Sequence, residues 1–254
     1  MTLLAIHGFT EDDSVWPRVL APLGRKIRAL LLPGHGWRPC PPTLDATAVA
    51  AEIASQLPET GGDLLGYSLG GRLALRSALD HPARVRRLVL IAAGPGPASP
   101  EDVAQRRITD ERLAESLEDS GLGPFIARWE AMPALRPALP WPSAVEASIR
   151  ARRLSHDPRG LAASLRFLGQ GAGPALWDRL AELTVPVLLV YGQQDPSLQA
   201  GTAMARRLPH ARLVAIPGAG HIIHREKPGD LLLALAGFLG REGDPEAVED
   251  ASIR

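Results

Sequence analysis

The chain has 254 residues with 28 basic and 28 acidic side chains, so its formal net charge is zero. A balanced charge excludes the clustered basic surface on which non-specific nucleic-acid binders depend, and no apolar run is long enough to span a bilayer. Cys40 is the only cysteine, which excludes an internal disulfide. No signal peptide is visible. We therefore expect a cytoplasmic protein without a nucleic-acid or membrane partner; the sequence leaves its oligomeric state open.

Short apolar runs alternate with segments of helical spacing through residues 1–96 and again through residues 180–240. Gly, Pro or Asp bounds each run, which is typical of strands. This alternation predicts right-handed crossovers and a mostly parallel sheet, so we assign both ranges to one α/β core. Strands are expected at Leu3–Ile6, Ile27–Leu32, Asp63–Leu65, Arg87–Ile91, Val187–Tyr191 and Arg212–Ile216, and helices at Leu44–Leu57, Leu69–Leu79, Thr202–Leu208 and Asp230–Leu239.

Residues 97–179 break this alternation. They contain no strand-like run, and several prolines separate four amphipathic segments, which predict helices. We interpret this range as a helical lid inserted between two strands of the core, and residues 241–254 as a polar tail. The lid helices are expected at Pro100–Ser120, Pro124–Met132, Ser143–Leu154 and Gly160–Leu168.

A Gly-x-Ser-x-Gly motif occupies residues 66–70, between an expected strand and an expected helix. In that setting a nucleophile elbow presents a serine at the top of the sheet. The glycines let the strand and the helix approach each other, while the turn holds Ser68 in a strained backbone conformation. The motif therefore predicts that Ser68 is catalytic.

Asp195 and His221 follow the last two expected strands. The carboxyl ends of parallel strands share one edge of the sheet, the edge at which Ser68 lies and at which such sheets bind ligands. The chain order serine, acid, histidine is that of an elbow triad. His221 would remove the hydroxyl proton of Ser68, and Asp195 would fix the tautomer of His221.

Other histidines are weaker candidates for the same role. None of them follows a strand with a matching partner, and His224 would be a surface residue or a neighbour of the triad. No spaced cluster of His, Cys and carboxylate side chains suggests a metal site, so we expect neither a metal nor a cofactor. The remaining candidates are the loop or lid residues His35, His81, His156 and His210.

A His-Gly-Phe sequence follows the first expected strand at residues 7–9. Gly8 allows a tight turn that can aim the backbone N–H of Phe9 at the site of Ser68. The N–H of Leu69 lies at a helix N-terminus, where it has no helical partner. Together these two N–H groups are the expected oxyanion hole.

These motifs resemble the α/β-hydrolase superfamily over nearly the whole chain. The resemblance implies an α/β-hydrolase fold with a helical lid. The superfamily's sheet usually starts with an antiparallel hairpin, but here the His-Gly strand begins at residue 2 or 3. We therefore expect a mostly parallel sheet of about six strands. The residues that carry the resemblance are His7-Gly8-Phe9, Leu32–Gly36, Gly66–Gly71, Asp195 and Gly220-His221.

A narrower resemblance is to the 2-succinyl-6-hydroxy-2,4-cyclohexadiene-1-carboxylate synthases of menaquinone biosynthesis. It implies a lyase that eliminates pyruvate from 2-succinyl-5-enolpyruvyl-6-hydroxy-3-cyclohexene-1-carboxylate, with the triad as base. That family usually has Asn at the position of Ile222. The residues that carry the resemblance are Arg72, Ala104–Arg107 followed by Asp110, Phe125–Trp129, Arg153-Leu154-Ser155, Gly160–Leu165 and Gly220–Pro228.

The same resemblance implies an anionic substrate held by Arg72, Arg106 and Arg153, with Tyr67 and Trp129 as further contacts. Arg72 lies early in the elbow helix, where the helix dipole disfavours a cation, and a substrate carboxylate would reverse that balance. The chain is rich in arginine, so each lid arginine is also a candidate surface residue. A shift of one residue would substitute Arg107 and Arg152 for the two lid arginines.

Two other functions stay open from the sequence. A carboxylesterase or a hydrolase of C–C bonds on the same scaffold would use Ser68 as a covalent nucleophile, but it would not need three converging cations. A non-catalytic binding protein of this fold would not need Ser68, His221 and Asp195 together. Fold analogy alone does not separate these functions.

Overall fold

The computed structural model describes residues 2–240, and the predicted tail at 241–254 lies outside the described residues. Six parallel strands form one sheet in the order β2-β1-β3-β4-β5-β6. The fold class and the number of strands predicted from the sequence are confirmed. The strands are β1 (Thr2–Ile6), β2 (Lys26–Leu30), β3 (Gly62–Tyr67), β4 (Val85–Ile91), β5 (Val187–Gly192) and β6 (Ala211–Ile216).

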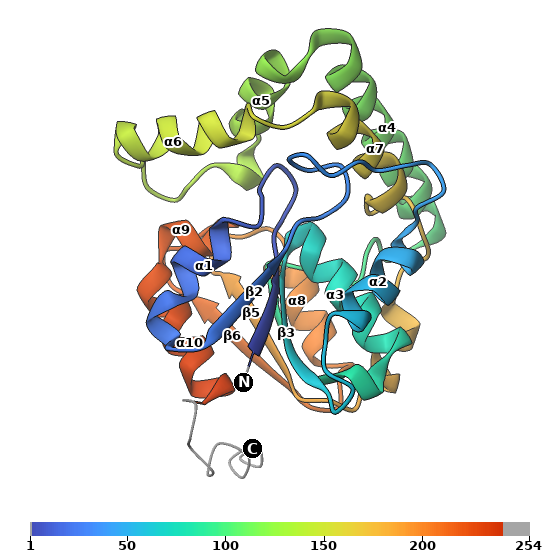
Figure 1. The fold of residues 1–254 in the computed structure, drawn as a ribbon, viewed down its shortest axis with the longest axis vertical. Coiled ribbons are helices and arrows are strands. Elements are labelled where there is room, and N and C mark those ends of the chain that lie inside the picture. The colour runs from blue at the N-terminus through green and yellow to red at the C-terminus, as the bar shows by residue number, and fades with distance from the viewer. Residues whose placement is uncertain (1, 241–254) are drawn as a thin grey trace.

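Helices cover both faces of the sheet (Figure 1). In β1, Leu3 and Ala5 point to one face, and Leu4 and Ile6 point to the other, so each face has its own apolar core. One face carries α1 (Val15–Leu20), α9 (Ile223–Glu226) and α10 (Pro228–Leu239); the other carries α2 (Ala46–Ser55), α3 (Ser68–Asp80) and α8 (Leu198–Ala205).

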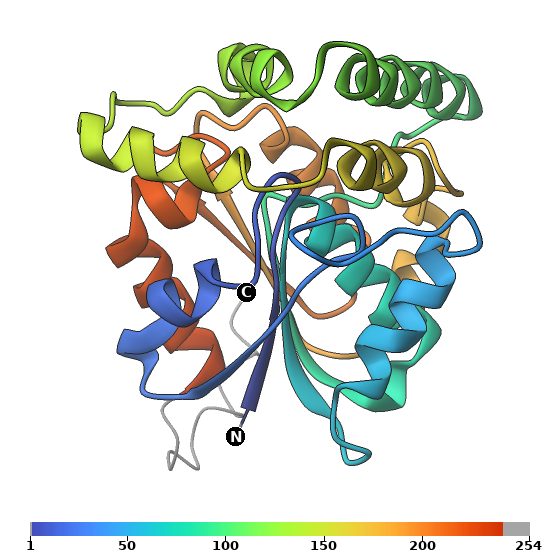
Figure 2. The same ribbon diagram turned by 45° about the horizontal axis from the view of Figure 1, so that its top comes forward.

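Four helices between β4 and β5 lie over the carboxyl ends of the strands (Figures 1 and 2). We call them the cap helices: α4 (Pro100–Ser120), α5 (Leu122–Ala131), α6 (Ser143–Arg153) and α7 (Pro158–Leu168). Three of them, α4, α5 and α7, pack around a small apolar core. The short 3-10 helices of the chain are Ala21–Leu23, Pro82–Arg84, Pro133–Leu135 and Trp177–Glu182.

Side-chain caps explain where two of the cap helices begin. The Ser99 hydroxyl accepts a hydrogen bond from Asp102 N–H at the start of α4, and the Asp157 carboxylate accepts one from Gly160 N–H at the start of α7. Both helices have proline in the first turn, where its missing N–H costs nothing. These signals are local, which is why the sequence predicts both helices closely.

The cap helices touch the core where Gly34 meets Gly160. A Cβ atom added to Gly34 would lie 2.2 Å from the Gly160 carbonyl oxygen, and Gly34 has a φ of +82°. His156, between α6 and α7, joins the same region: its Nδ1 accepts from Gly36 N–H at 2.8 Å and its Nε2 lies 3.2 Å from Thr10 O. The close approach of residue 34 to the Gly160 carbonyl is possible only because residue 34 is glycine.

Some element boundaries differ from the sequence predictions, for physical reasons. β2 ends at Leu30 rather than Leu32, because Leu32 N–H donates to His7 Nε2 at 3.0 Å instead of to a strand. α8 begins four residues before the predicted Thr202, and α1 was not predicted. α1 has six residues and contains Pro17, so the sequence gives it little helical signal.

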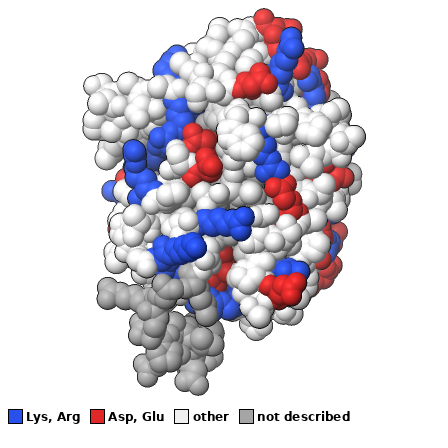
Figure 3. Space-filling view, viewed as in Figure 1, with Lys and Arg blue, Asp and Glu red and all other residues white. Residues whose placement is uncertain are grey.

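The sheet leaves β2 and β6 at its two edges. Lys26 and Arg28 are exposed on β2, and charged side chains on an edge strand discourage pairing with another chain. On the face drawn in Figure 3, basic side chains of the described residues are interspersed with acidic and uncharged ones. Within residues 2–240, no helix is both long and apolar enough to cross a membrane.

Candidate active site

The predicted nucleophile elbow forms at the junction of β3 and α3. β3 ends at Tyr67, and Ser68 opens α3 with a φ of +51°. This left-handed conformation is costly for a residue with a Cβ atom, so the surrounding packing must hold it. A Cβ atom at Gly66 would lie 2.5 Å from the Gly70 carbonyl oxygen, which is why this turn needs glycine. The strained conformation predicted for Ser68 is confirmed.

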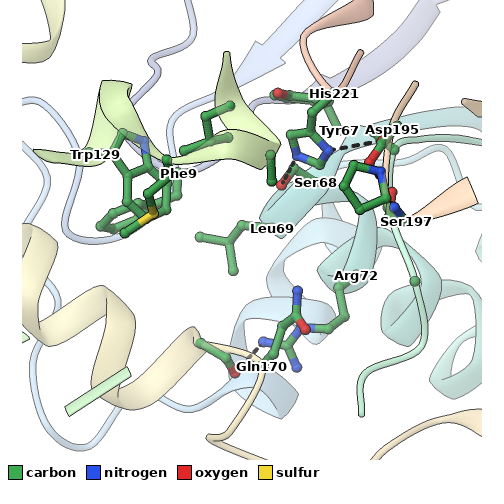
Figure 4. Close-up of a pocket in the computed structure, with 18 of the residues that line it drawn as sticks. Phe9, Tyr67, Ser68, Leu69, Arg72, Trp129, Gln170, Asp195, Ser197 and His221 are labelled. Carbon is green, nitrogen blue, oxygen red and sulfur yellow. Dashed lines mark hydrogen bonds and ion pairs between the residues drawn. The ribbon is translucent and has the colours of Figure 1, made fainter. Parts of the chain in front are cut away.

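His221 lies between Ser68 and Asp195 (Figure 4). Its Nε2 lies 3.1 Å from Ser68 Oγ, and its Nδ1 lies 3.0 Å from Asp195 Oδ2. Asp195 follows β5 and His221 follows β6, so the sheet brings both to the edge that carries the elbow. A proton on Nδ1 leaves Nε2 free to accept the Ser68 proton, which is the arrangement that activates a serine.

The Asp195 carboxylate is nearly buried. Burial alone would raise its pKa, but hydrogen bonds from His221 and from Ser197 N–H outweigh burial and lower the pKa. Asp195 is therefore ionised at neutral pH. It can hold the Nδ1 proton of His221 and stabilise the imidazolium that forms when Ser68 loses its proton.

A cavity of about 400 Å³ opens beside Ser68 and His221. Phe9 and Leu69, the predicted oxyanion-hole residues, line it together with Tyr67 and Trp129. The Phe9 ring packs edge-on against Trp129, with 5.1 Å between ring centroids. Figure 4 places this aromatic pair across the cavity from the triad residues. The cavity thus has a reactive side and an aromatic side.

Three arginines also line this cavity, and they are the three expected from the resemblance: Arg72, Arg106 and Arg153. The neighbouring candidates lie elsewhere. Arg107 donates to the Gly171 carbonyl, and Arg152 lies 3.7 Å from an Asp12 carboxylate oxygen.

Arg72 makes no ion pair with a carboxylate of the described residues. Its guanidinium donates to the backbone carbonyls of Leu168 and Gly169, and its Nε has no hydrogen-bond partner there. Burial lowers the pKa of Arg72 to about 10, so the group stays charged at neutral pH. A buried cation beside a cavity and without an anionic partner favours an anionic ligand.

The other two arginines each have a carboxylate partner. Arg106 Nε donates to Asp110 Oδ1 at 2.7 Å, and Arg153 Nη1 donates to Glu130 Oε1 at 3.0 Å. Both carboxylates lie on the cap helices, as do the arginines themselves. These pairs fix the guanidinium groups while leaving other N–H groups for a ligand, because a guanidinium has five donors.

Tyr67 is buried beneath this cavity between two histidines. Its ring centroid lies 5.5 Å from that of His221 and 4.7 Å from that of His224. Burial raises the pKa of the Tyr67 phenol well above its ordinary value, so the hydroxyl keeps its proton. Ile222, the departure from the narrower family, also lines the cavity.

Sequence reasoning missed Glu11, a buried carboxylate that lines the cavity. Glu11 Oε1 lies 2.9 Å from His224 Nε2 and 3.3 Å from Arg225 Nη2. Burial would raise the pKa of Glu11, but His224 and Arg225 outweigh it and hold this pKa well below its usual range. The only feature of the sequence that could have pointed to Glu11 is its partner His224, three residues after the catalytic candidate His221.

The remaining histidine candidates do not line the cavity. His35 and His156 are buried in a cluster with His7, the first residue after β1; their ring centroids lie 4.9 Å (His7–His35) and 5.6 Å (His35–His156) apart. His224 is not a surface residue: it is 1% exposed. Within residues 2–240, no group of three or more His, Cys, Asp or Glu side chains is arranged to hold a metal ion.

Comparison with known proteins shows the family. Residues 3–235 match the Alpha/beta hydrolase family. The chain belongs to the α/β-hydrolase family. It is 35% identical over 235 residues to a putative 2-succinyl-6-hydroxy-2,4-cyclohexadiene-1-carboxylate synthase of Bacillus subtilis, which covers 89% of this chain and 85% of that protein. The narrower resemblance seen in the sequence is therefore confirmed as a resemblance.

Other members of the α/β-hydrolase family are also similar. The structure of MenH from S. aureus superposes with a TM-score of 0.89 at 29% identity, over 94% of this chain and 93% of that one. A pimeloyl-[acyl-carrier protein] methyl ester esterase of Chromobacterium violaceum is 33% identical over 93% of each chain. Because the named relatives are enzymes, the family relationship supports an enzyme, and it includes both synthases and esterases.

Proposed function

We propose that the protein is a lyase that eliminates pyruvate from 2-succinyl-5-enolpyruvyl-6-hydroxy-3-cyclohexene-1-carboxylate and forms 2-succinyl-6-hydroxy-2,4-cyclohexadiene-1-carboxylate. The observation that carries this proposal is the set of three guanidinium groups around the cavity beside Ser68 and His221. The substrate has three carboxylates, one on the ring and one on each of its two side arms. Three cations at one cavity suit such a trianion, and a neutral ester would not need them.

In this proposal the triad acts as a base. His221 draws the proton from Ser68, and the Ser68 oxygen removes a proton from a ring carbon of the substrate. The electron pair of that C–H bond forms a new ring double bond, the existing ring double bond shifts by one carbon, and the C–O bond to the enolpyruvyl group breaks. The enolate of pyruvate leaves and takes up a proton to become pyruvate. No metal or cofactor is needed for these steps.

The oxyanion hole would stabilise the charge that develops on the succinyl carbonyl oxygen as the ring proton leaves. Its donors are the backbone N–H groups of Phe9 and Leu69, both of which line the cavity. Each preorganised donor of this kind lowers the reaction barrier by on the order of 3 kcal/mol.

Residues 97–179 act here as a lid that brings Arg106 and Arg153 to the substrate, and residues 1–96 and 180–240 form the core.

A second candidate is an esterase, and one observation favours it: a methyl ester esterase is nearly as similar to the chain as the synthase. In that reaction Ser68 Oγ attacks the ester carbonyl, the alcohol leaves with the proton from His221, and water releases the acid. Tyr67 and Trp129 would then contact the acyl chain instead of a ring.

In the deciding experiment, the enzyme that makes the cyclohexene substrate generates it in situ, this protein is added, and pyruvate and the absorbance of the diene product are followed together. The proposal expects both to appear at equal rates, well above the spontaneous rate, and to be lost in Ser68→Ala. If pyruvate release is no faster than the uncatalysed reaction while a methyl or aryl ester is hydrolysed, the esterase is correct. Failure of both reactions, with Ser68 also inert to a fluorophosphonate, would indicate the binding protein.

A further inference from the structure

Asp110 on α4 is a buried carboxylate that the proposed reaction does not itself use. It is 3% exposed, and both of its oxygens have partners. Oδ1 accepts from Arg106 Nε at 2.7 Å, and Oδ2 accepts from the backbone N–H of Gly171 at 3.0 Å. Asp110 therefore joins one of the cavity arginines to the chain segment that follows α7.

We call residues 168–171, which are the last residue of α7 and the three residues after it, the strap. From its other side, the Arg72 guanidinium donates to the strap carbonyls of Leu168 and Gly169. Figure 4 shows Arg72 reaching from α3 towards this segment at Gln170. The strap is thus held between Asp110 of a cap helix and Arg72 of a core helix.

The strap fits closely against Asp110. A Cβ atom added to Gly169 would lie 2.6 Å from Asp110 Oδ2 and 2.1 Å from the Leu165 carbonyl oxygen. There is no room for the carboxylate to move towards the strap, so this close contact and the hydrogen bond from Gly171 N–H fix the strap's position. The position of the strap carbonyls in turn fixes where Arg72 can lie.

The charges of this group do not balance. Arg72 and Arg106 bring two positive charges, and Asp110 supplies one negative charge. No other carboxylate of the described residues pairs with either guanidinium. One carboxylate of a ligand in the cavity would complete the neutralisation, and both arginines line that cavity.

We propose that Asp110 is a positioning residue: it orients Arg106 directly and Arg72 through the strap, so that the two guanidinium groups act as one anion-binding pair. The pair then takes a carboxylate of the substrate. The assignment of that carboxylate to the cyclohexene substrate rests on the proposed function, whereas the pairing of the two arginines through Asp110 does not.

The test compares Asp110→Asn with Glu111→Gln. Glu111 is the next residue of the same helix, and its carboxylate accepts from Arg166 of α7 at 2.7 Å without lining the cavity. Both variants replace a carboxylate that tethers α4 to α7 or the strap with an amide of nearly the same shape. They differ in whether that carboxylate also holds the cavity arginines.

The first readout is the pyruvate-release assay. Asp110→Asn should raise KM about tenfold or more, because charged hydrogen bonds are lost, and should lower kcat much less. Glu111→Gln should leave both near the wild-type values. A variant that is only less stable would lower the melting temperature without this change in KM. Equal KM values for wild type and Asp110→Asn would overturn the proposal.

The second readout does not need turnover. A neutral fluorophosphonate labels Ser68, and succinate, a small dicarboxylate, should slow this labelling by occupying the arginines. Asp110→Asn should need about tenfold more succinate for half-protection than wild type or Glu111→Gln. If pyruvate release fails in wild type but this difference is found, the proposed function is wrong and the positioning role stands.

Absence of succinate protection in wild type, or equal protection in both variants, would overturn the anion-binding pair. If Asp110→Asn does not fold, as judged by circular dichroism, Asp110→Ser replaces it. Serine is uncharged and smaller than aspartate, so it fits the same space but cannot hold Arg106 and the strap as the carboxylate does, and it should show the same loss of succinate protection. Wild-type protection in a folded Asp110→Ser protein would contradict the proposal.

Discussion

Glu11 and His224 form a buried pair, 2.9 Å apart, that ties the loop after β1 to α9, the helix that follows the loop after β6. The first loop carries Phe9, the candidate oxyanion residue, and the loop before α9 carries His221. The pair therefore fixes the distance between the group that would stabilise the developing charge and the group that would move the proton.

We expect Glu11→Gln to lower the free energy of unfolding by about 2 kcal/mol, since His224 and Arg225 lose a buried charged acceptor. It should also reduce kcat more than it raises KM, because it shifts the catalytic loops and leaves the arginines in place. Urea denaturation and steady-state kinetics measure the two effects. Glu118→Gln, on the exposed side of α4, is the control; equal stability of both variants would contradict the expectation.

Removal of any triad side chain should abolish most turnover. Ser68→Ala, His221→Ala and Asp195→Asn should each lower kcat on the order of 10³-fold or more, the last because an amide supports the wrong His221 tautomer. Circular dichroism should show an intact fold in each. A variant that keeps near wild-type kcat would remove its residue from the mechanism.

The cavity arginines have matched controls next to them in the chain. Arg106→Ala and Arg153→Ala should each raise KM for the trianionic substrate about tenfold to a hundredfold through lost charged hydrogen bonds. Arg152→Ala should have little effect on KM, because that side chain points to Asp12. Arg107→Ala removes one hydrogen bond to the strap at Gly171, so its effect on KM should be clearly smaller than that of Arg106→Ala. A larger rise in KM for Arg107→Ala and Arg152→Ala than for Arg106→Ala and Arg153→Ala would show that Arg107 and Arg152 bind the substrate instead.

Stability should fall on mild acidification. Burial lowers the pKa values of His7, His35 and His156 below the ordinary 6.5. As pH falls through 6.5 the unfolded chain takes up protons at these rings and the folded chain does not. The free energy of unfolding therefore decreases below about pH 6.5, by up to about 1.4 kcal/mol per pH unit for each ring, and is insensitive to them above it.

Melting temperatures from pH 8 to pH 5.5 would measure this dependence. In His156→Asn the amide can still serve Gly36 N–H or Thr10 O but does not titrate, so the decline towards low pH should be shallower than in wild type. His210→Asn, which changes an exposed histidine, is the matched control. An identical decline in His156→Asn and wild type would show that His156 does not contribute.

The elbow and the candidate triad could be predicted because their signals are local. Ser68 stands in a strand–turn–helix sequence, and Asp195 and His221 each follow an apolar run. Parallel strands then bring the three to one edge without further information. The cavity positions of Arg106 and Arg153 came from family resemblance, since the arginine-rich sequence alone did not separate them from their neighbours.

The roles of Glu11 and Asp110 could not be predicted in the same way. The partner of Glu11 lies 213 residues away, and Asp110 meets Gly171 across 61 residues. Contacts of that separation depend on how the cap helices and loops pack, and no periodicity encodes them. α1 was missed for the opposite reason: it is short, and the core stabilises it more than its own sequence does.

Arg72, Arg106 and Arg153 come from three different helices: α3 of the core, and α4 and α6 of the cap. A ligand that touches all three can bind only when cap and core are assembled. Ligand binding therefore stabilises the assembly of cap and core in addition to the contacts at Gly34 and His156. This stabilisation grows with the ligand concentration. An occupied cavity should consequently protect the cap helices from proteases, so the substrate would serve as a temporary cross-link between two parts of its own enzyme.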